Sequence, residues 1–298
     1  MKELVQLQAG GASARLLPGA GGRVSALRLV RPSGGKVDVL HPYPEDLFDP
    51  IRWAKGGIYP LMPYSNRIAN AILDVNGEAV PLQAHPDAAP HTLHGNAHGV
   101  VWQTLASEEA SAVLALDCPP SAAWPWRYWA RMRLDLAPSE LVVRIEIRNA
   151  DARVMPAGIG LHPYFRHQPQ ARLGYHAMTV WPPTADFLAT SARSPLASEI
   201  YTPARSLRAG GLTDYVGGWD GAATVDLPEG ARLRLVADPV FSHLVIHRPD
   251  NLAYLCLEPV SHVADGFNLH ARGITGTGTR MLAPGESLGG AIRLQLVE

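Results

Sequence analysis

Alternation of apolar and polar residues constrains the fold of this 298-residue chain more than any other feature of the sequence. In the segment 141–148 the odd positions are Leu, Val, Ile and Ile, and three of the four even positions are charged. The segment 128–136 alternates in the same way, and a Pro-Ser-Glu turn joins the two. Because successive side chains of a strand point to opposite faces, both segments are predicted to be half-buried β-strands.

Shorter segments of strand character follow along the rest of the chain, and helical periodicity is nearly absent. The 28 glycines and 26 prolines punctuate these segments, which predicts an all-β sandwich or barrel rather than alternating strands and helices. The segment 184–221 is the least regular, and because it retains large apolar side chains we expect a long loop packed over the sheet. Further strands are predicted at residues 24–29, 100–105, 113–116, 232–236, 243–247, 253–258 and 291–297.

Composition argues against several functional classes. With 26 basic and 27 acidic side chains, the net charge of −1 gives no indication of nucleic acid or an anionic membrane as a partner. No apolar run approaches the roughly 20 residues that span a bilayer, no secretory stretch opens the chain, and no glycine-rich phosphate loop indicates a nucleotide cofactor. Cys118 and Cys256 are expected to be buried free thiols of a reduced, cytoplasmic protein, with one buried bridge as the alternative.

Glu258 is the first candidate for chemistry. In the expected strand 253–258, alternation places Tyr254, Cys256 and Glu258 on one face, and Pro259 follows at once. A carboxylate presented at the end of a strand among apolar neighbours should have a raised pKa, which suits a general base near neutral pH. The alternative is a structural glutamate paired to an arginine.

His162 is the second candidate. It lies in the stretch Gly-Ile-Gly-Leu-His-Pro-Tyr-Phe, and because it precedes Pro163 its backbone should be extended. An imidazole with the ordinary pKa near 6.5 can donate a proton at physiological pH. Taken alone, a histidine in such a setting is more often a satisfied core residue.

Other polar side chains have weaker signals. Arg67, beside Asn66, offers five donors in a rigid fork that suits ring and hydroxyl oxygens, with a surface ion pair as the alternative. Asp214, taken singly, is typical of a turn. Seven tryptophans could supply a flat platform for a sugar ring, although most belong in a core. A histidine-rich stretch lies in a loop without an acidic or cysteine cluster, so we expect no metal there: His85, His91, His94 and His98.

Five fragments, taken in this order, resemble the aldose 1-epimerase (galactose mutarotase) family. The similarity spans nearly the whole chain, so we expect a single domain over residues 1–298. Each fragment is weak alone, but their order is specific, and a Pro-Gly-Glu at 284–286 precedes the last expected strand. The fragments are Pro-Tyr-Ser-Asn-Arg-Ile (63–68), Leu-His-Gly (93–95), Gly-Leu-His-Pro-Tyr-Phe (160–165), Asp214 with Trp-Asp-Gly (219–221), and Leu-Glu-Pro (257–259).

The resemblance implies a galactose-mutarotase-like β-supersandwich with a sugar cleft, a free aldose as substrate, and neither metal nor nucleotide cofactor. His162 matches the general acid of the family and Glu258 its general base. The base removes the proton of the anomeric hydroxyl while the acid protonates the ring oxygen, so the ring opens and can close as the other anomer. The sugar-binding positions correspond to Arg67, His94 and Asp214, with Asn66 beside them.

The chain departs from the family at Leu161 and Pro163, where galactose mutarotases usually have Asn and then Thr or Ser around the histidine. This leaves galactose, glucose, another neutral aldose and a hexose 6-phosphate open as substrates, although no obvious second basic cluster accompanies Arg67 and Arg166 in the sequence. Two other functions also stay open: a glycoside hydrolase using Glu258 and Asp214 as its carboxylates, and a non-catalytic sugar-binding module. The sequence does not decide between a monomer and a homodimer.

Overall fold

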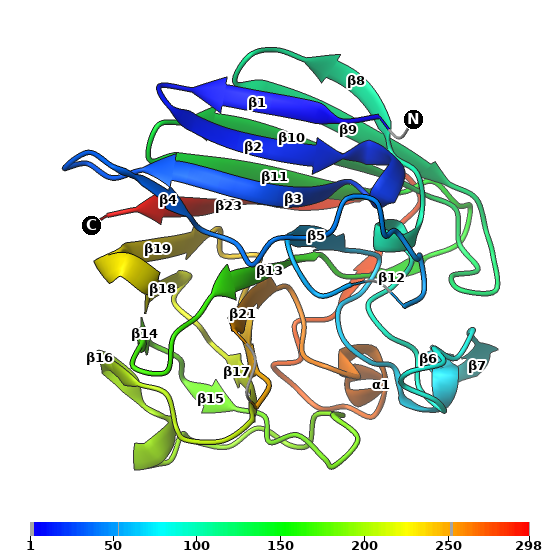
Figure 1. Cartoon of the computed structure of the whole chain (residues 1–298). Helices are drawn as coiled ribbons and strands as arrows, with labels where there is room; N and C mark the ends of the chain where they lie inside the picture. Colours follow the sequence, from blue (N-terminus) through cyan, green and yellow to red (C-terminus); the bar gives the residue numbers. More distant parts are fainter. Residues whose placement is uncertain (1–2, 53, 251–252, 298) are drawn as a thin grey trace.

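The computed structural model describes residues 3–52, 54–250 and 253–297, and it consists mainly of antiparallel β-strands (Figure 1). Two large sheets hold most of them. The first sheet runs in spatial order through β1 (Val5–Ala9), β2 (Ala12–Leu17), β3 (Arg23–Val30), β5 (Ile58–Leu61), β13 (Gly160–Arg166), β21 (Tyr254–Val260), β20 (His243–Arg248), β17 (Leu212–Gly217) and β15 (Thr179–Val180), with β4 (Lys36–Asp38) paired to β3.

The second sheet packs against the first. Its spatial order is β16 (Tyr201–Ser206), β14 (Arg172–Tyr175), β18 (Ala222–Asp226), β19 (Arg232–Ala237), β23 (Ser287–Leu296), β11 (Glu140–Asn149), β10 (Tyr128–Ala137), β9 (Ser111–Cys118) and β8 (Gln103–Ser107). Two short pairs complete the strands: β6 (Ile72–Val75) with β7 (Glu78–Pro81), and β12 (Met155–Ala157) with β22 (Arg280–Leu282). The α-helix found in the described part of the chain is α1 (Gly266–Ala271).

The core lies between the two sheets, as the alternation predicts. In Figure 1, β1, β2 and β3 lie in front of β9, β10 and β11, and both β1 and β2 contact β10. The odd positions of 141–147 and the even positions of 128–136 are buried in one continuous apolar cluster, so the predicted faces of both strands are confirmed. The longest helix in the described part of the chain, α1, has 6 residues, whereas a helix needs roughly 20 apolar residues to cross a bilayer.

The segment 184–221 corrects the sequence prediction, because it is not a loop throughout. It contains β16 and β17, and β17 is hydrogen-bonded within the first sheet between β15 and β20. In β17, Leu212, Asp214 and Val216 point to one face, and Thr213 and Tyr215 to the other. The strand period was present in the sequence, but the charged Asp214 at an inward position concealed it.

The two faces of β21 lie in two different apolar clusters. Leu255 and Leu257 belong to the core between the sheets, whereas Tyr254 and Cys256 belong to a second, smaller apolar cluster on the opposite face of the first sheet. The predicted division of this strand is therefore confirmed, although β21 continues past Glu258 to Val260. Cys256 and Cys118 are both buried free thiols, as expected.

Candidate active site

A cavity of about 220 Å³ opens on the face of the first sheet that points away from the sandwich core. Five of the six side chains singled out from the sequence line it, and Asp214 does not. The lining residues are Lys55, Tyr59, Asn66, Arg67, Leu93, His94, His162, Tyr164, Phe187, Thr213, Tyr215, Val245, His247, Tyr254 and Glu258.

Lateral pairing across the first sheet determines which side chains meet in the cavity. His162 of β13 is paired with Tyr59 of β5, Glu258 of β21 with Val245 of β20, and Val245 with Tyr215 of β17. Laterally paired residues point to the same face of a sheet. One row of side chains, contributed by five neighbouring strands, therefore forms the floor of the cavity.

The next row along the strands adds further cavity groups. Tyr164 is paired with Cys256, Cys256 with His247, and His247 with Thr213. The hydroxyl of Thr213 lies 2.9 Å from Nδ1 of His247. This row brings an imidazole, a hydroxyl and a phenol beside the first row.

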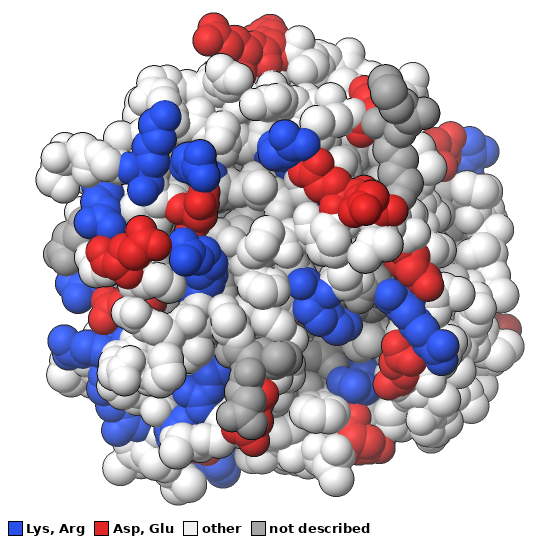
Figure 2. Space-filling view, viewed as in Figure 1, with Lys and Arg blue, Asp and Glu red and all other residues white. Residues whose placement is uncertain are grey.

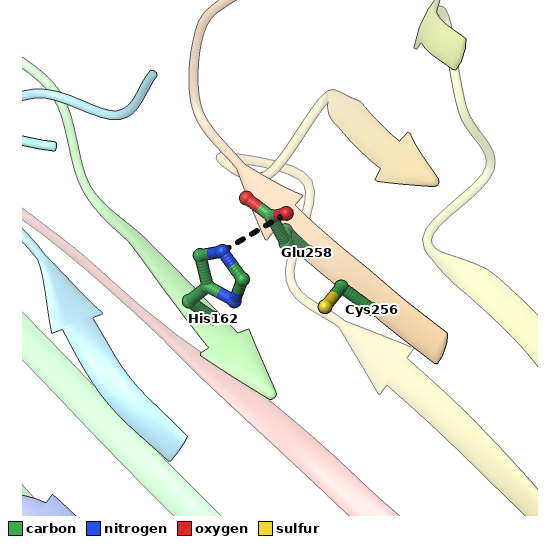
Figure 3. Close-up of side chains that lie close together, drawn as sticks. All are labelled: His162, Cys256 and Glu258. Atoms are coloured by element: carbon green, nitrogen blue, oxygen red, sulfur yellow. Dashed lines mark ion pairs between the residues drawn. The ribbon is translucent and has the colours of Figure 1, made fainter. Parts of the chain in front are cut away.

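His162 and Glu258 face one another at the centre of the cavity floor. Nε2 of His162 lies 3.3 Å from Oε1 of Glu258, and Figure 3 shows the two side chains pointing toward each other from adjacent strands, with Cys256 two residues earlier on β21. The solvent-exposed fractions of His162 and Glu258 are 5% and 3%, so both side chains are buried. Within the described structure, Nδ1 of His162 and Oε2 of Glu258 are buried without a hydrogen-bond partner, which is uncommon in a folded protein and indicates a functional site.

Burial sets the protonation of this pair. It raises the pKa of Glu258 to about 8 and lowers the pKa of His162 well below its usual value, with further lowering by the positive charges of Lys55 and Arg23. At neutral pH the resting pair is therefore an uncharged carboxyl group beside an uncharged imidazole. Transfer of one proton across the 3.3 Å gap converts it into an ion pair of the same net charge.

Two tyrosine rings hold the imidazole of His162 in place. The ring stacks against Tyr59, at 4.7 Å between centroids, and against Tyr164, at 4.5 Å, and the two tyrosine rings lie 6.2 Å from each other. Behind Tyr59 lies the fully buried guanidinium of Arg23, which is 4.4 Å from the Tyr59 ring and 4.5 Å from the ring of Tyr43. This stack fixes the plane of the imidazole so that its Nε2 edge faces the carboxyl group.

His94 and Asn66 hold each other in unusual backbone conformations. Both residues are left-handed, with φ of 62° and 58°, and Gly95 follows at 68°. The amide of His94 donates to the carbonyl oxygen of Asn66 at 2.8 Å, and the amide of Asn66 donates to Nδ1 of His94 at 3.0 Å. Because Nδ1 accepts this bond, Nε2 carries the proton, and burial keeps the pKa of His94 well below its usual value. His94 is therefore placed as a neutral hydrogen-bond donor.

Arg67 lines the cavity next to Asn66. Its guanidinium carbon lies 4.8 Å from the centroid of the Phe187 ring, and partial burial lowers its pKa. In the described part of the chain no ion pair involves this side chain. Arg67 therefore adds a guanidinium with five N–H donors to the cavity wall.

Asp214, in contrast, is directed away from the cavity. It is paired with Ile246, which is paired with Leu257, and both of these belong to the core between the sheets. Nη2 of Arg208 binds both carboxylate oxygens of Asp214, at 2.7 and 2.8 Å. The structure thus does not support the sugar-binding role that the resemblance implied for Asp214. It also does not bring Asp214 and Glu258 together as the two carboxylates of a hydrolase.

The aromatic surfaces of the cavity come from tyrosines rather than tryptophans. Trp102, Trp126 and Trp219 are buried in the core, and Trp53 lies outside the described residues. Cavity residues that the sequence analysis did not single out as ligand-binding are Lys55, Tyr59, Leu93, Tyr164, Phe187, Thr213, Tyr215, Val245, His247 and Tyr254. Period-two spacing relative to Glu258 and His162 was the available signal for Tyr164, Cys256 and Tyr254, but nothing in the sequence indicated which strands would be neighbours.

The histidine-rich stretch does not gather around a common point. His85 binds the carbonyl oxygen of Ile51, His91 binds Asp186 at 2.8 Å, and His94 binds the Asn66 amide. Among the described residues, the side chains spaced closely enough to hold a metal are His162, Cys256 and Glu258, whose ligand atoms lie within 4.8 Å of one another. A metal bound there would occupy both members of the acid–base pair.

The two-sheet sandwich, with a cavity that opens on the outer face of one sheet, is a galactose-mutarotase-like fold. A protein of Escherichia coli K12 superposes with a TM-score of 0.86 at 23% identity over 99% of both chains. The galactose 1-epimerase of Lactobacillus acidophilus NCFM superposes with a TM-score of 0.77 at 15% identity, over 98% of this chain and 94% of that one. At these identities the likeness establishes the fold, and the predicted fold class is confirmed.

Sequence comparison identifies the family. The sequence model of the family described as aldose 1-epimerase matches residues 3–295, so the chain belongs to the aldose 1-epimerase family and is an isomerase of that type. The resemblance seen in the five fragments is confirmed. A curated relative is the uncharacterized protein YphB of Escherichia coli K12, which is 27% identical over 243 residues, covering 77% of this chain and 80% of YphB.

Replacing Asp214 tests whether it is structural. Asp214→Asn removes the negative partner of Arg208 in a pair whose carboxylate is buried and whose guanidinium is 37% exposed, so we expect it to lower the free energy of unfolding by roughly 1 kcal/mol. Because the side chain does not line the cavity, affinity for an aldose should not change. Urea denaturation and calorimetric titration with the sugar measure the two quantities. Unchanged stability together with lost sugar affinity would contradict this placement.

Replacing Glu258 tests the burial of its carboxyl group. The unfolded chain ionises this group at its ordinary pKa of 4.5, whereas the folded protein keeps it protonated to about pH 8, so the wild type loses stability as pH rises between these values. Gln does not titrate. Glu258→Gln should therefore gain stability relative to the wild type by about 3 kcal/mol between pH 5 and pH 7.5.

Urea denaturation of the wild type and of Glu258→Gln, at about pH 5 and about pH 7.5, measures this difference. Titration of the histidines affects the stability of both proteins and therefore cancels in the comparison. The exposed Glu108, changed to Gln, is the matched control and should show no such dependence on pH. An equal stability difference for Glu258→Gln at both pH values would show that the carboxyl group ionises normally.

Proposed function

We propose that this isomerase interconverts the α and β anomers of a free aldose, with Glu258 as the general base and His162 as the general acid. The observation that carries the proposal is the buried pair at 3.3 Å, whose Oε2 and Nδ1 atoms have no partner in the described structure. Membership of the aldose 1-epimerase family supports a mutarotase-type function.

The mechanism starts from the ion-pair form, in which the imidazole holds the mobile proton. Glu258 takes the proton of the anomeric hydroxyl as His162 donates its proton to the ring oxygen, and the bond between C1 and the ring oxygen breaks. The products are an open-chain aldehyde, a neutral carboxyl group and a neutral imidazole. The protein therefore reaches its uncharged resting form, favoured by burial, while the sugar ring is open.

Ring closure reverses the proton transfers. Rotation about C1–C2 turns the other face of the carbonyl toward the C5 hydroxyl, whose proton passes to His162 as its oxygen attacks C1. Glu258 returns its proton to the carbonyl oxygen, which becomes the new anomeric hydroxyl. The pair ends with the single mobile proton it began with, so neither cofactor nor net proton exchange with solvent is needed in the cycle.

The cavity walls supply groups that can orient the sugar. Nε2–H of His94 and the fork of Arg67 are donors suited to hydroxyl oxygens, as the family resemblance implies. A hydrolase would need a second carboxylate, and among the described residues that line the cavity Glu258 is the one acidic side chain. The geometry therefore favours anomer exchange over glycoside hydrolysis.

The catalytic roles are tested by following anomer equilibration of freshly dissolved α-glucose and α-galactose by polarimetry or NMR. Each positioned proton transfer contributes roughly 10²- to 10⁴-fold, so Glu258→Gln and His162→Asn should each lose at least about 100-fold of the wild-type acceleration. The exposed residues Glu108 and His176, changed to Gln and Asn, are matched controls that should keep it. Wild-type rates in both site variants would overturn the assignment.

The pH dependence tests the shared proton. Above about pH 8, Glu258 loses its proton while His162 is already neutral, so the pair holds no proton to donate and kcat/KM should fall. On the acid side, kcat/KM should fall only well below pH 6.5, because burial lowers the pKa of His162. NMR exchange rates, corrected for the spontaneous reaction, give this profile. A loss of activity centred near pH 6.5 would instead show an imidazole of ordinary pKa.

A further inference from the structure

A histidine, a cysteine and a glutamate lie together on the cavity side of the first sheet. One ligand atom each from His162, Cys256 and Glu258 lies within 4.8 Å of the other two, and all three side chains are buried. Figure 3 shows them on the neighbouring strands β13 and β21. The acid–base mechanism uses His162 and Glu258 but gives Cys256 no role, so the third member of the cluster is left without a function.

The spacing of these atoms fits a tetrahedral zinc site. Zn²⁺ binds a histidine nitrogen at about 2.0–2.1 Å, a carboxylate oxygen at about 2.0–2.2 Å and a cysteine sulfur at about 2.3 Å. Nitrogen and oxygen ligands of one ion then lie roughly 3.3–3.5 Å apart, and Nε2 of His162 lies 3.3 Å from Oε1 of Glu258. A sulfur ligand lies about 3.6 Å from the other two, which Sγ of Cys256 reaches from at most 4.8 Å by a movement of roughly 1 Å.

The carboxyl group of Glu258 has bonding capacity that the protein does not use. Figure 2 shows basic side chains beside acidic ones across much of the visible face, and Arg28 with Asp38 at 2.7 Å is an ion pair of this kind. In the part of the chain that the structure describes, Glu258 has no such partner among the lysines and arginines, and its Oε2 atom is buried without a hydrogen bond. Nδ1 of His162 is in the same position. Buried polar atoms without a partner are uncommon, and a bound ion is one way to satisfy them.

The charges of the three ligands match a divalent cation. A thiolate and a carboxylate together carry two negative charges and imidazole binds as a neutral ligand, so a divalent ion gives a neutral complex, as burial requires. Sulfur and nitrogen ligands favour Zn²⁺ over Mg²⁺ and Ca²⁺, which take oxygen ligands. On binding, the thiol releases its proton and the His162–Glu258 pair releases its one mobile proton, so the charge of the site does not change.

We propose that His162, Cys256 and Glu258 form a binding site for Zn²⁺ and that the bound ion inhibits the isomerase. The ion occupies the nitrogen and the carboxylate that transfer protons to and from the sugar, so it acts as an inhibitor and not as a cofactor. The inhibition rests on the function proposed above, whereas the binding of the ion does not.

The first experiment measures Zn²⁺ binding by isothermal titration calorimetry, which is independent of activity. Loss of an outer partner of a metal ligand already costs about 10–100-fold in affinity, so Cys256→Ala, which removes a ligand itself, should weaken binding by about 100-fold or more. Cys118, the other buried free thiol, lies outside the cluster, and Cys118→Ala is the matched control that should keep the wild-type affinity. Equal affinity of the wild type and Cys256→Ala overturns the site.

The second experiment detects the thiolate ligand directly in the wild type, and so does not depend on the folding of Cys256→Ala. Co²⁺ takes tetrahedral sites of this ligand type and, unlike Zn²⁺, gives a charge-transfer absorption band when a thiolate binds it. Titration of the wild type with Co²⁺ should produce this band, and Zn²⁺ should remove it. Cys118→Ala should keep the band, which assigns it to Cys256. A wild-type titration without the band overturns the site.

The third experiment tests inhibition by following anomer exchange in protein freed of metal by a chelator. Zn²⁺ should suppress the exchange, excess chelator should restore it, and Mg²⁺ should have no effect. Measured against its own metal-free rate, Cys256→Ala should need about 100-fold more Zn²⁺ for the same inhibition, and Cys118→Ala should behave as the wild type. Zn²⁺ that binds through Cys256 and leaves the exchange rate unchanged overturns the inhibition. If the metal-free wild type accelerates no exchange, the proposed function fails, and calorimetry and the Co²⁺ spectrum still decide the metal site.

Discussion

The antiparallel pairing of β13 with β21 is the constraint on which the whole site depends. Gly160 is paired with Val260 and Tyr164 with Cys256, so His162 lies level with Glu258 midway between these pairs. A shift of one residue in this register would reverse the faces of one strand relative to the other, so that either His162 or Glu258 would point to the opposite face of the sheet. The leucine that precedes it, Leu161 or Leu257, would then face the cavity.

The sandwich core prevents such a shift. Leu161 and Leu257 are both buried between the two sheets, and moving a buried leucine into a polar cavity forfeits roughly 1.5–3 kcal/mol of apolar burial. Every second residue of β13 and β21 contributes to this restraint. The apolar face of the sheet thus positions the polar face, and the stability of the sandwich supports a carboxyl group whose own burial is unfavourable above its ordinary pKa.

Local sequence patterns were sufficient for the parts of the structure that depend on one strand at a time. The faces of 128–136, 141–148 and 253–258 follow from period two, and the raised pKa of Glu258 follows from its apolar neighbours. Asp214 shows the limit, since its place on the inward face depends on β17 pairing with β20, and the sequence does not specify that partner. Lys55 shows the same limit, because no motif connects it to a cavity built around residues a hundred or more positions later.

The charge distribution of the cavity acts on the protonation of His162 and Glu258. The positive charge of Lys55 lowers the pKa of His162 and so disfavours the imidazolium that must protonate the ring oxygen. The uncharged form of the pair is therefore the resting state, and ring opening starts from the less populated ion-pair form, in which the imidazole holds the proton.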